Sequence, residues 1–175
     1  MSKTILVTGA TGNQGGALVT QLANHPAFHV LAVTRNASSP SAQALQSKGK
    51  NITLVQGDLN DVPALFTAAK KVGKGDIWGV FSVQVSMGKG VTSEGEVKQG
   101  TDLIDASVKQ GVQCFVYSSV DRGGDEVNWA RETSVPHFQT KYRIERYLRE
   151  RAGDTMGWTV LRPGEFLPCV PTYLR

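Results

Sequence analysis

The residues best suited to chemistry form a glycine-rich stretch, ILVTGATGNQGG, from Ile5 to Gly16. We expect Gly9 to allow a tight turn, Gly12 to let the backbone approach a phosphate, and Gly15 to let a helix pack on the preceding strand. The helix would direct free N–H groups and the positive end of its dipole at an anion. The stretch therefore predicts a strand that turns into a helix over a pyrophosphate. An ordinary glycine-rich turn is the alternative.

The spacing of these glycines is GxxGxxG, not the GxGxxG of the commonest dinucleotide fingerprint, so the glycines alone are weak evidence. Their context strengthens the prediction. A short apolar run precedes them, and after them apolar residues recur near helical spacing at Ala17, Leu18, Leu22 and Ala23.

Arg35 follows the second expected strand, 29–34, where a dinucleotide fold meets the adenosine ribose. An acidic residue there binds the 2′-hydroxyl of NAD, whereas an arginine accommodates the 2′-phosphate of NADP. The next acidic residue is Asp58, so the sequence predicts NADP(H). A solvated arginine at a strand end is the alternative.

Asp58 comes just after the third expected strand, 52–56. Its carboxylate would lie near the adenine and could accept a hydrogen bond from the exocyclic amine. We give equal weight to the alternative that Asp58 caps the next helix, for which Asn60 and Asp61 are also candidates.

The composition is typical of one α/β globular domain over 1–175, with 40% hydrophobic and 19% charged residues. The net charge is +4, but the basic residues do not form one cluster. The run from Lys141 to Arg151 is interleaved with Glu145 and Glu150, which favours a solvated helix face over a binding patch. We therefore expect no direct nucleic-acid binding.

The two cysteines, Cys114 and Cys169, have no metal-ligand spacing and form no disulfide framework, so we expect a reducing compartment and no metal. We also expect no signal peptide and no membrane association, because no apolar run approaches the roughly 20 residues of a membrane span. The expected location is the cytoplasm, with the nucleus as an alternative.

Strand and helix patterns alternate along the chain, which predicts a doubly wound parallel sheet of the Rossmann type with strand order 3-2-1-4-5-6. Within the expected fourth helix, Ser93 and Glu96 suggest a capping box. Gly100 in its middle suggests close packing against a strand or a ligand. The expected strands are 5–8, 29–34, 52–56, 77–85, 114–118 and 159–162, and the main helices follow the first strand, begin at Ser39 and Pro40, and span about 63–72, 93–111 and 137–151.

Seven segments in order give the chain a resemblance to the NmrA-like family, which is related to the short-chain dehydrogenases. They are TGATGNQG at 8–15, the arginine at 35, GDLND at 57–61, EVKQG at 96–100, GVQCFVYSS at 111–119, PHFQTK at 136–141 and LRPGEF at 161–166.

The resemblance implies an NADP-binding Rossmann domain in a redox-sensing regulator or an oxidoreductase. By position, it implies that Arg35 binds the 2′-phosphate and Lys141 the nicotinamide ribose. It also implies that Asp58 and Leu59 flank adenine, that Phe81 and Ser82 lie on the ribose side, and that the pyrophosphate is lined by Gly9, Thr11, Gly12, Asn13, Gln14 and Gly15.

The residues expected to do catalysis depart from the short-chain dehydrogenase pattern. Active members have a tyrosine four residues before the lysine, and here that position holds His137. Tyr142 cannot replace it simply, because one step along a helix turns a side chain by roughly 100°. We favour a structural or cofactor-contacting role for His137, with acid catalysis by its imidazole as the alternative.

Two functions follow from the resemblance. The chain is either a redox sensor that signals NADP(H) binding to a protein partner, or a reductase similar to the isoflavone-reductase-like enzymes, which also lack the tyrosine and use the lysine for proton transfer. Family members usually continue for more than a hundred residues past LRPGEF, so we expect this chain to lack the smaller lobe. Uncovered apolar sheet surface would then favour a homodimer.

Overall fold

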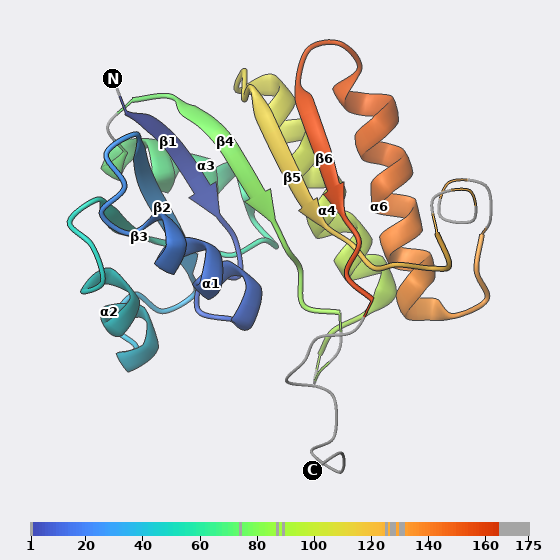
Figure 1. The fold of residues 1–175 in the computed structure, drawn as a ribbon. Helices are drawn as coiled ribbons and strands as arrows, with labels where there is room; N and C mark the ends of the chain where they lie inside the picture. The colour runs from blue at the N-terminus through green and yellow to red at the C-terminus, as the bar shows by residue number, and fades with distance from the viewer. Residues whose placement is uncertain are drawn as a thin grey trace.

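The computed structural model describes residues 2–164 apart from 74, 87, 89, 125, 127, 128, 130 and 131. Strands and helices alternate along this part of the chain (Figure 1). The strands are β1 (Lys3–Val7), β2 (Phe28–Thr34), β3 (Ile52–Gln56), β4 (Ile77–Ser82), β5 (Cys114–Ser118) and β6 (Gly157–Leu161). The helices are α1 (Asn13–Leu22), α2 (Pro40–Gln46), α3 (Val62–Val72), α4 (Ser93–Lys109) and α6 (Pro136–Ala152).

The six strands form one parallel sheet in the order β3-β2-β1-β4-β5-β6, which confirms the predicted fold. Because every strand runs in the same direction, all their carboxyl ends meet at one edge. β1 lies between β2 and β4, so the strand order reverses there, and ligands of open parallel sheets bind outside the carboxyl ends at such a point.

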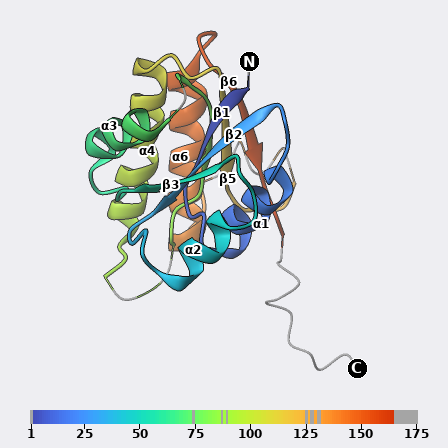
Figure 2. The same ribbon diagram turned by 90° about the vertical axis from the view of Figure 1, so that its left-hand side faces the viewer.

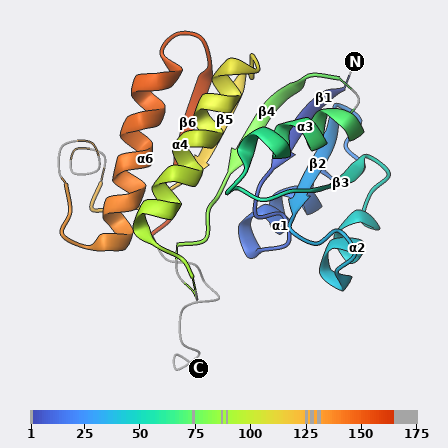
Figure 3. The same ribbon diagram turned by 180° about the vertical axis from the view of Figure 1, so that it is seen from behind.

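Helices cover the sheet in two layers (Figures 2 and 3). α3, α4 and α6 bury the larger core, in which Leu6, Leu103, Phe115 and Ile144 are among the fully buried side chains. α1 and α2 bury a smaller core on the other face, around Val7 and Val19. The sheet strands therefore carry apolar side chains on both faces, as a parallel sheet requires.

The helix starts follow from short polar side chains. Ser39 accepts a hydrogen bond from the N–H of Ala42 at the start of α2, with Pro40 at the first helical position. Thr92 caps α4 by accepting from Gly95, so the predicted capping box of Ser93 and Glu96 is wrong. Glu96 is instead buried.

Gly100 lies at the contact between α4 and α6. A Cβ on this residue would lie 2.7 Å from Cδ1 of Ile144, so the close neighbour is a helix and not the predicted strand or ligand. In the described part of the chain, no helix is long and apolar enough to cross a bilayer. The predicted features at Glu165, Phe166 and Cys169 lie outside the described residues.

Candidate functional site

The glycine turn has the geometry that the sequence predicts at two of its three positions. Gly9 has a φ of +57°, in the left-handed region, and a Cβ there would lie 2.6 Å from Cγ1 of Val83. A Cβ on Gly15 would clash with the carbonyl oxygen of Gly9. Glycine is therefore needed at Gly9 for the turn and at Gly15 for the packing of α1 against it.

Gly12, which lies between these two glycines, is the N-cap of α1 and provides no side chain to cap the helix. The first turn of α1 contains no acidic residue, and Thr11 and Asn13 beside it are exposed. The backbone N–H groups at this helix end and the positive end of the dipole are therefore available to an anion, which fits a pyrophosphate.

Two side chains fasten this turn to neighbouring strands. The hydroxyl of Thr8 lies 3.0 Å from the carbonyl oxygen of Val83 and accepts from the N–H of Val83 at 2.8 Å, just beyond β4. Ser118, at the carboxyl end of β5, donates a hydrogen bond to the Oε1 atom of Gln14. The side-chain oxygen of Gln14 is therefore engaged by Ser118, while the backbone of Gln14 belongs to the first turn of α1.

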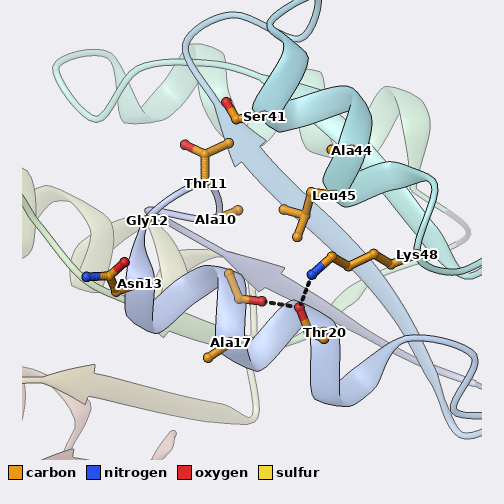
Figure 4. A pocket seen from close by; sticks show the side chains of 11 residues that line it. Ala10, Thr11, Gly12, Asn13, Ala17, Thr20, Ser41, Ala44, Leu45 and Lys48 are labelled. Carbon is orange, nitrogen blue, oxygen red and sulfur yellow. Dashed lines mark hydrogen bonds between the residues drawn. The ribbon is translucent and has the colours of Figure 1, made fainter. Parts of the chain in front are cut away.

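A groove of about 460 Å³ runs from the glycine turn along the space between α1 and α2 (Figure 4). Lys48 spans it and donates to the hydroxyl of Thr20 at 3.0 Å. The groove is lined by Ala10, Thr11, Gly12, Asn13, Gly16, Ala17, Thr20, Ser41, Ala44, Leu45 and Lys48.

Arg35 lies just after β2, on the loop that leads to α2, and does not line this groove. Its side chain is exposed, and within the described residues it makes no hydrogen bond or ion pair. Neighbouring side chains shape the loop instead, because the carboxamide oxygen of Asn36 accepts from the N–H of Ser38 and that of Gln56 accepts from Ala37. The Arg35 guanidinium is thus available to a ligand at the carboxyl edge.

The structure separates the two roles considered for Asp58. Asp61 caps α3, accepting from the N–H of Ala64 at 3.0 Å. Asp58 is exposed and accepts from the N–H of Asn60 at 2.8 Å, which shapes the turn before α3. Leu59 is half-buried against the larger core. The helix cap is therefore Asp61, and the Asp58 carboxylate stays at the carboxyl edge.

Phe81 and Ser82, at the end of β4, are both buried. The carbonyl oxygen of Phe81 accepts from the N–H of Thr8 at 3.0 Å, and the hydroxyl of Ser82 accepts from the carboxamide of Gln84 at 2.9 Å. The side chains of both residues are therefore buried inside the protein.

Lys141, on α6, is buried where this helix contacts α4. Its Nζ atom lies 2.9 Å from Oε1 of Glu96, and the two side chains are only 5% and 1% exposed. Oε1 of Glu96 also accepts from the hydroxyl of Ser86, and Oε2 accepts from the hydroxyl of Thr140, each at 2.8 Å. The candidate lysine is therefore paired with a carboxylate whose orientation is fixed by hydrogen bonds from Ser86 and Thr140.

The nearby aromatic side chains do not replace the missing tyrosine. Tyr117, in β5, is fully buried, with its ring centroid 5.5 Å from Nζ of Lys141. Burial raises the pKa of the Tyr117 phenol well above its ordinary value, and the charges of Glu96 and Glu145 raise that pKa further. The raised pKa makes the phenol a weaker proton donor, and burial keeps it away from solvent.

His137 and Tyr142 flank Lys141 on α6. His137 is half-buried in the first turn, and its Nδ1 atom has no hydrogen-bond partner among the described residues. The Tyr142 ring is buried, with the guanidinium of Arg122 5.6 Å from its centroid. The structure therefore places His137 one helical turn from Lys141 and gives it no proton-relay partner in this part of the chain.

A second buried charge cluster lies on the same helix. Glu145 is fully buried, and its Oε2 atom accepts from Arg122 at 2.8 Å and from Arg162 at 3.0 Å. Ser119 donates a further hydrogen bond to Glu145. Burial alone would raise the pKa of the Glu145 carboxyl, but these hydrogen bonds outweigh burial and lower that pKa.

The prediction of a solvated face from Lys141 to Arg151 is therefore wrong for Lys141 and Glu145. Arg146 and Glu150 are exposed, as predicted, and form an ion pair. A signal for the buried charges was present, because Lys141, Glu145, Leu148 and Ala152 recur at helical spacing on one face. Partners from α4 and from the loops beside β5 and β6 were not visible in that spacing.

The model of the NmrA-like family matches residues 1–173. The chain belongs to the NmrA-like family. The oxidoreductase hkm9 of Aspergillus hancockii, an NmrA-like protein, is 34% identical over 151 residues, which cover 85% of this chain and 42% of that protein. The oxidoreductase FrzB of a Cladobotryum species is 30% identical over 176 residues, which cover 95% of this chain and 48% of FrzB. The chain thus spans less than half the length of these curated relatives.

Solved structures share the NmrA-like protein's Rossmann fold. The UDP-Glc/GlcNAc 4-epimerase of Campylobacter jejuni superposes with a TM-score of 0.70 at 18% identity, over 92% of this chain and 53% of the epimerase. The NADPH-dependent quinone oxidoreductase QOR2 of Escherichia coli, solved with NADPH, gives a TM-score of 0.65 at 24% identity, over 90% of this chain and 48% of QOR2. At these identities the likeness shows the fold alone.

Proposed function

We propose that this NmrA-like chain binds NADP(H) at the carboxyl edge of the sheet and that binding serves as a redox signal. The observation that carries the proposal is the exposed, unengaged Arg35 guanidinium at the end of β2, on the same edge as the glycine turn. A guanidinium can bind a phosphate through two parallel hydrogen bonds, whereas a carboxylate at this place would repel it.

The remaining residues have distinct roles in this proposal. The N–H groups at the start of α1 bind the pyrophosphate, with Thr11 and Asn13 beside them. Asp58 and Leu59 flank the adenine, and Lys141 binds the nicotinamide ribose. A bound nicotinamide supplies or accepts a hydride. Because Lys141 is buried beside Glu96 and the position of the missing tyrosine holds His137, we favour signalling over substrate chemistry.

The cofactor proposal is tested by calorimetric titration of NADP⁺, NADPH, NAD⁺ and NADH into the wild type and Arg35→Glu. We expect the wild type to prefer the phosphorylated pair and the variant to lose at least tenfold in NADP⁺ affinity, because a charge-assisted contact becomes a repulsion. Lys50→Glu makes the same charge change just before β3, at the opposite edge of the sheet, and should bind as wild type. An unchanged NADP preference in Arg35→Glu would contradict the proposal.

A reductase is the second candidate, because the relatives hkm9 and FrzB are named oxidoreductases. The test is single-turnover oxidation of bound NADPH with a panel of enones, quinones and imines. The signalling proposal predicts no oxidation above the rate in buffer. Oxidation that Lys141→Ala abolishes and Lys98→Ala, on the exposed face of α4, leaves intact would reject signalling and establish the reductase.

The signal needs a partner, and we propose either a regulatory protein or a second copy of this chain. Leu161, in β6, is 45% exposed, and Val85, beyond β4, is 60% exposed. Both lie near the carboxyl edge, so a partner seated there would be close to the bound cofactor.

A further inference from the structure

Glu96 is a buried carboxylate for which neither helix capping nor cofactor binding gives a reason. It lies in the first turn of α4 and receives three hydrogen-bond donors from two other segments. These donors are Lys141 and Thr140 of α6 and Ser86 of the segment after β4. Both carboxylate oxygens are thus occupied, so the group has one orientation.

A buried ion pair of this kind is weak evidence of stabilisation, because the desolvation of two charges offsets much of their attraction. Its surroundings differ from those of the two other ion pairs that the described residues form between α4 and α6. Glu94 pairs with Arg143, with side chains 78% and 42% accessible, and Asp105 pairs with Arg151, with side chains 46% and 45% accessible. The two helices are therefore already joined by solvated pairs, and the buried pair needs another explanation.

The ammonium of Lys141 has three N–H donors. In the described residues Glu96 is its one hydrogen-bond partner, so donors remain for a further acceptor. The Ser86 contact links the same carboxylate to the segment that follows β4, and this segment borders the switch point beside β1. Glu96 thus joins the lysine to the loop beside the switch point, where we expect the nicotinamide half of the cofactor to lie.

We propose that Glu96 is a positioning residue, which fixes the Lys141 ammonium and the Ser86 segment together so that Lys141 can donate to the hydroxyls of the nicotinamide ribose. This inference rests on the proposed function. It predicts that Glu96 affects the nicotinamide half of the cofactor and leaves the adenosine half alone.

The test compares two ligands in Glu96→Gln, which keeps the size and the acceptor oxygen but removes the charge. NADPH contains the nicotinamide ribose, and adenosine 2′,5′-bisphosphate does not. We expect Glu96→Gln to weaken NADPH binding about tenfold and to leave the bisphosphate within twofold of wild type. Glu94→Gln, the matched change on the exposed pair with Arg143, should alter neither. Equal weakening of both ligands in Glu96→Gln, or of neither, would overturn the inference.

A second readout needs no nucleotide. Hydrogen exchange by mass spectrometry should show faster deuterium uptake in the peptides that contain Ser86 and Lys141 in Glu96→Gln, and wild-type uptake in Glu94→Gln. Unchanged uptake in Glu96→Gln would overturn the inference whether or not the cofactor binds. Failure of the wild type to bind NADPH would overturn the proposed function instead.

If Glu96→Gln does not fold, Ser86→Ala removes one of the three donors and keeps the ion pair. We expect the same pattern with a smaller loss, about threefold in NADPH affinity and none in bisphosphate affinity. Equal losses for the two ligands would again contradict a positioning role.

Discussion

At the residue scale, the buried charges of α6 differ from its exposed ones in what they do for the fold. Glu145 lies between the guanidiniums of Arg122 and Arg162, which come from the segments after β5 and β6. Removal of the carboxylate would take its charge away from two largely buried guanidiniums. Loss of one partner from a buried ion pair is strongly destabilising, by about 3–5 kcal/mol.

We predict that Glu145→Gln lowers the free energy of unfolding at pH 7 by about 3 kcal/mol. The pKa of Glu145 is lower in the folded state than in an unfolded chain, where a glutamate has a pKa of about 4.3. The carboxylate therefore stabilises the fold above that unfolded value, and its contribution is lost as the pH falls through the lower folded pKa.

Urea denaturation of wild type and variant at a series of pH values from neutral to acidic measures this dependence. The two free energies of unfolding should converge as the solution is acidified through and below the unfolded glutamate pKa. Glu150→Gln, which breaks the exposed pair with Arg146, should follow the wild type at every pH. A Glu145→Gln deficit that is the same at all pH values would contradict this prediction.

At the scale of the elements, the contact between α4 and α6 positions Lys141. The two helices approach closely because Gly100 has no side chain where Ile144 packs. Cγ1 and Cγ2 of Ile144 would lie 2.9 Å and 3.0 Å from a Cβ on Gly100, so the whole isoleucine would have to shift. Separation of the helices here would also separate Glu96 from Lys141.

We predict that Gly100→Ala destabilises the protein by about 1 kcal/mol. Overpacking should cost about 2 kcal/mol, and the better helix propensity of alanine should return about 1 kcal/mol of it. The measurement is urea denaturation of Gly100→Ala, Ile144→Val and the double variant. Because valine lacks the closest atom, the substitutions should be coupled, with the double variant more stable than the sum of the two effects implies. Additive effects would contradict this account.

At the scale of the whole molecule, the helices cover the sheet unevenly. One face carries α3, α4 and α6, whereas on the other face the described residues place no helix over β5 and β6 (Figure 1). Strand register brings Val116 beside Thr159 and Ser118 beside Leu161 on this face. Leu161 is 45% exposed on this face, and exposed apolar surface favours association.

We predict that this chain forms a dimer that Leu161→Glu weakens. Sedimentation equilibrium should give a dimer mass for the wild type and a mass shifted toward the monomer for the variant, because a charge cannot be buried unpaired in an apolar contact. Val72→Glu changes a similarly exposed residue at the far end of α3 and should stay dimeric. A wild type that stays monomeric at all concentrations would exclude the homodimer and leave a regulatory protein as the proposed partner.

The sequence alone determined the features that depend on local backbone chemistry and on the order of the elements. Gly9 and Gly15 were assigned from their spacing, since a left-handed turn and a close helix leave no room for a Cβ. The strand order followed from alternating patterns, because right-handed crossovers leave few ways to arrange parallel strands. The assignment of Arg35 to a 2′-phosphate is also local and stays a prediction.

Only the tertiary structure decided the partners of the charged residues. Glu96 and Lys141 are 45 positions apart in the sequence, and Glu145 binds arginines from two other segments. The helix pattern of each segment is compatible with a charge on either a solvated or a buried face. The docking of α4 against α6 buried these charges and paired them, because an unpaired charge inside a protein is strongly disfavoured.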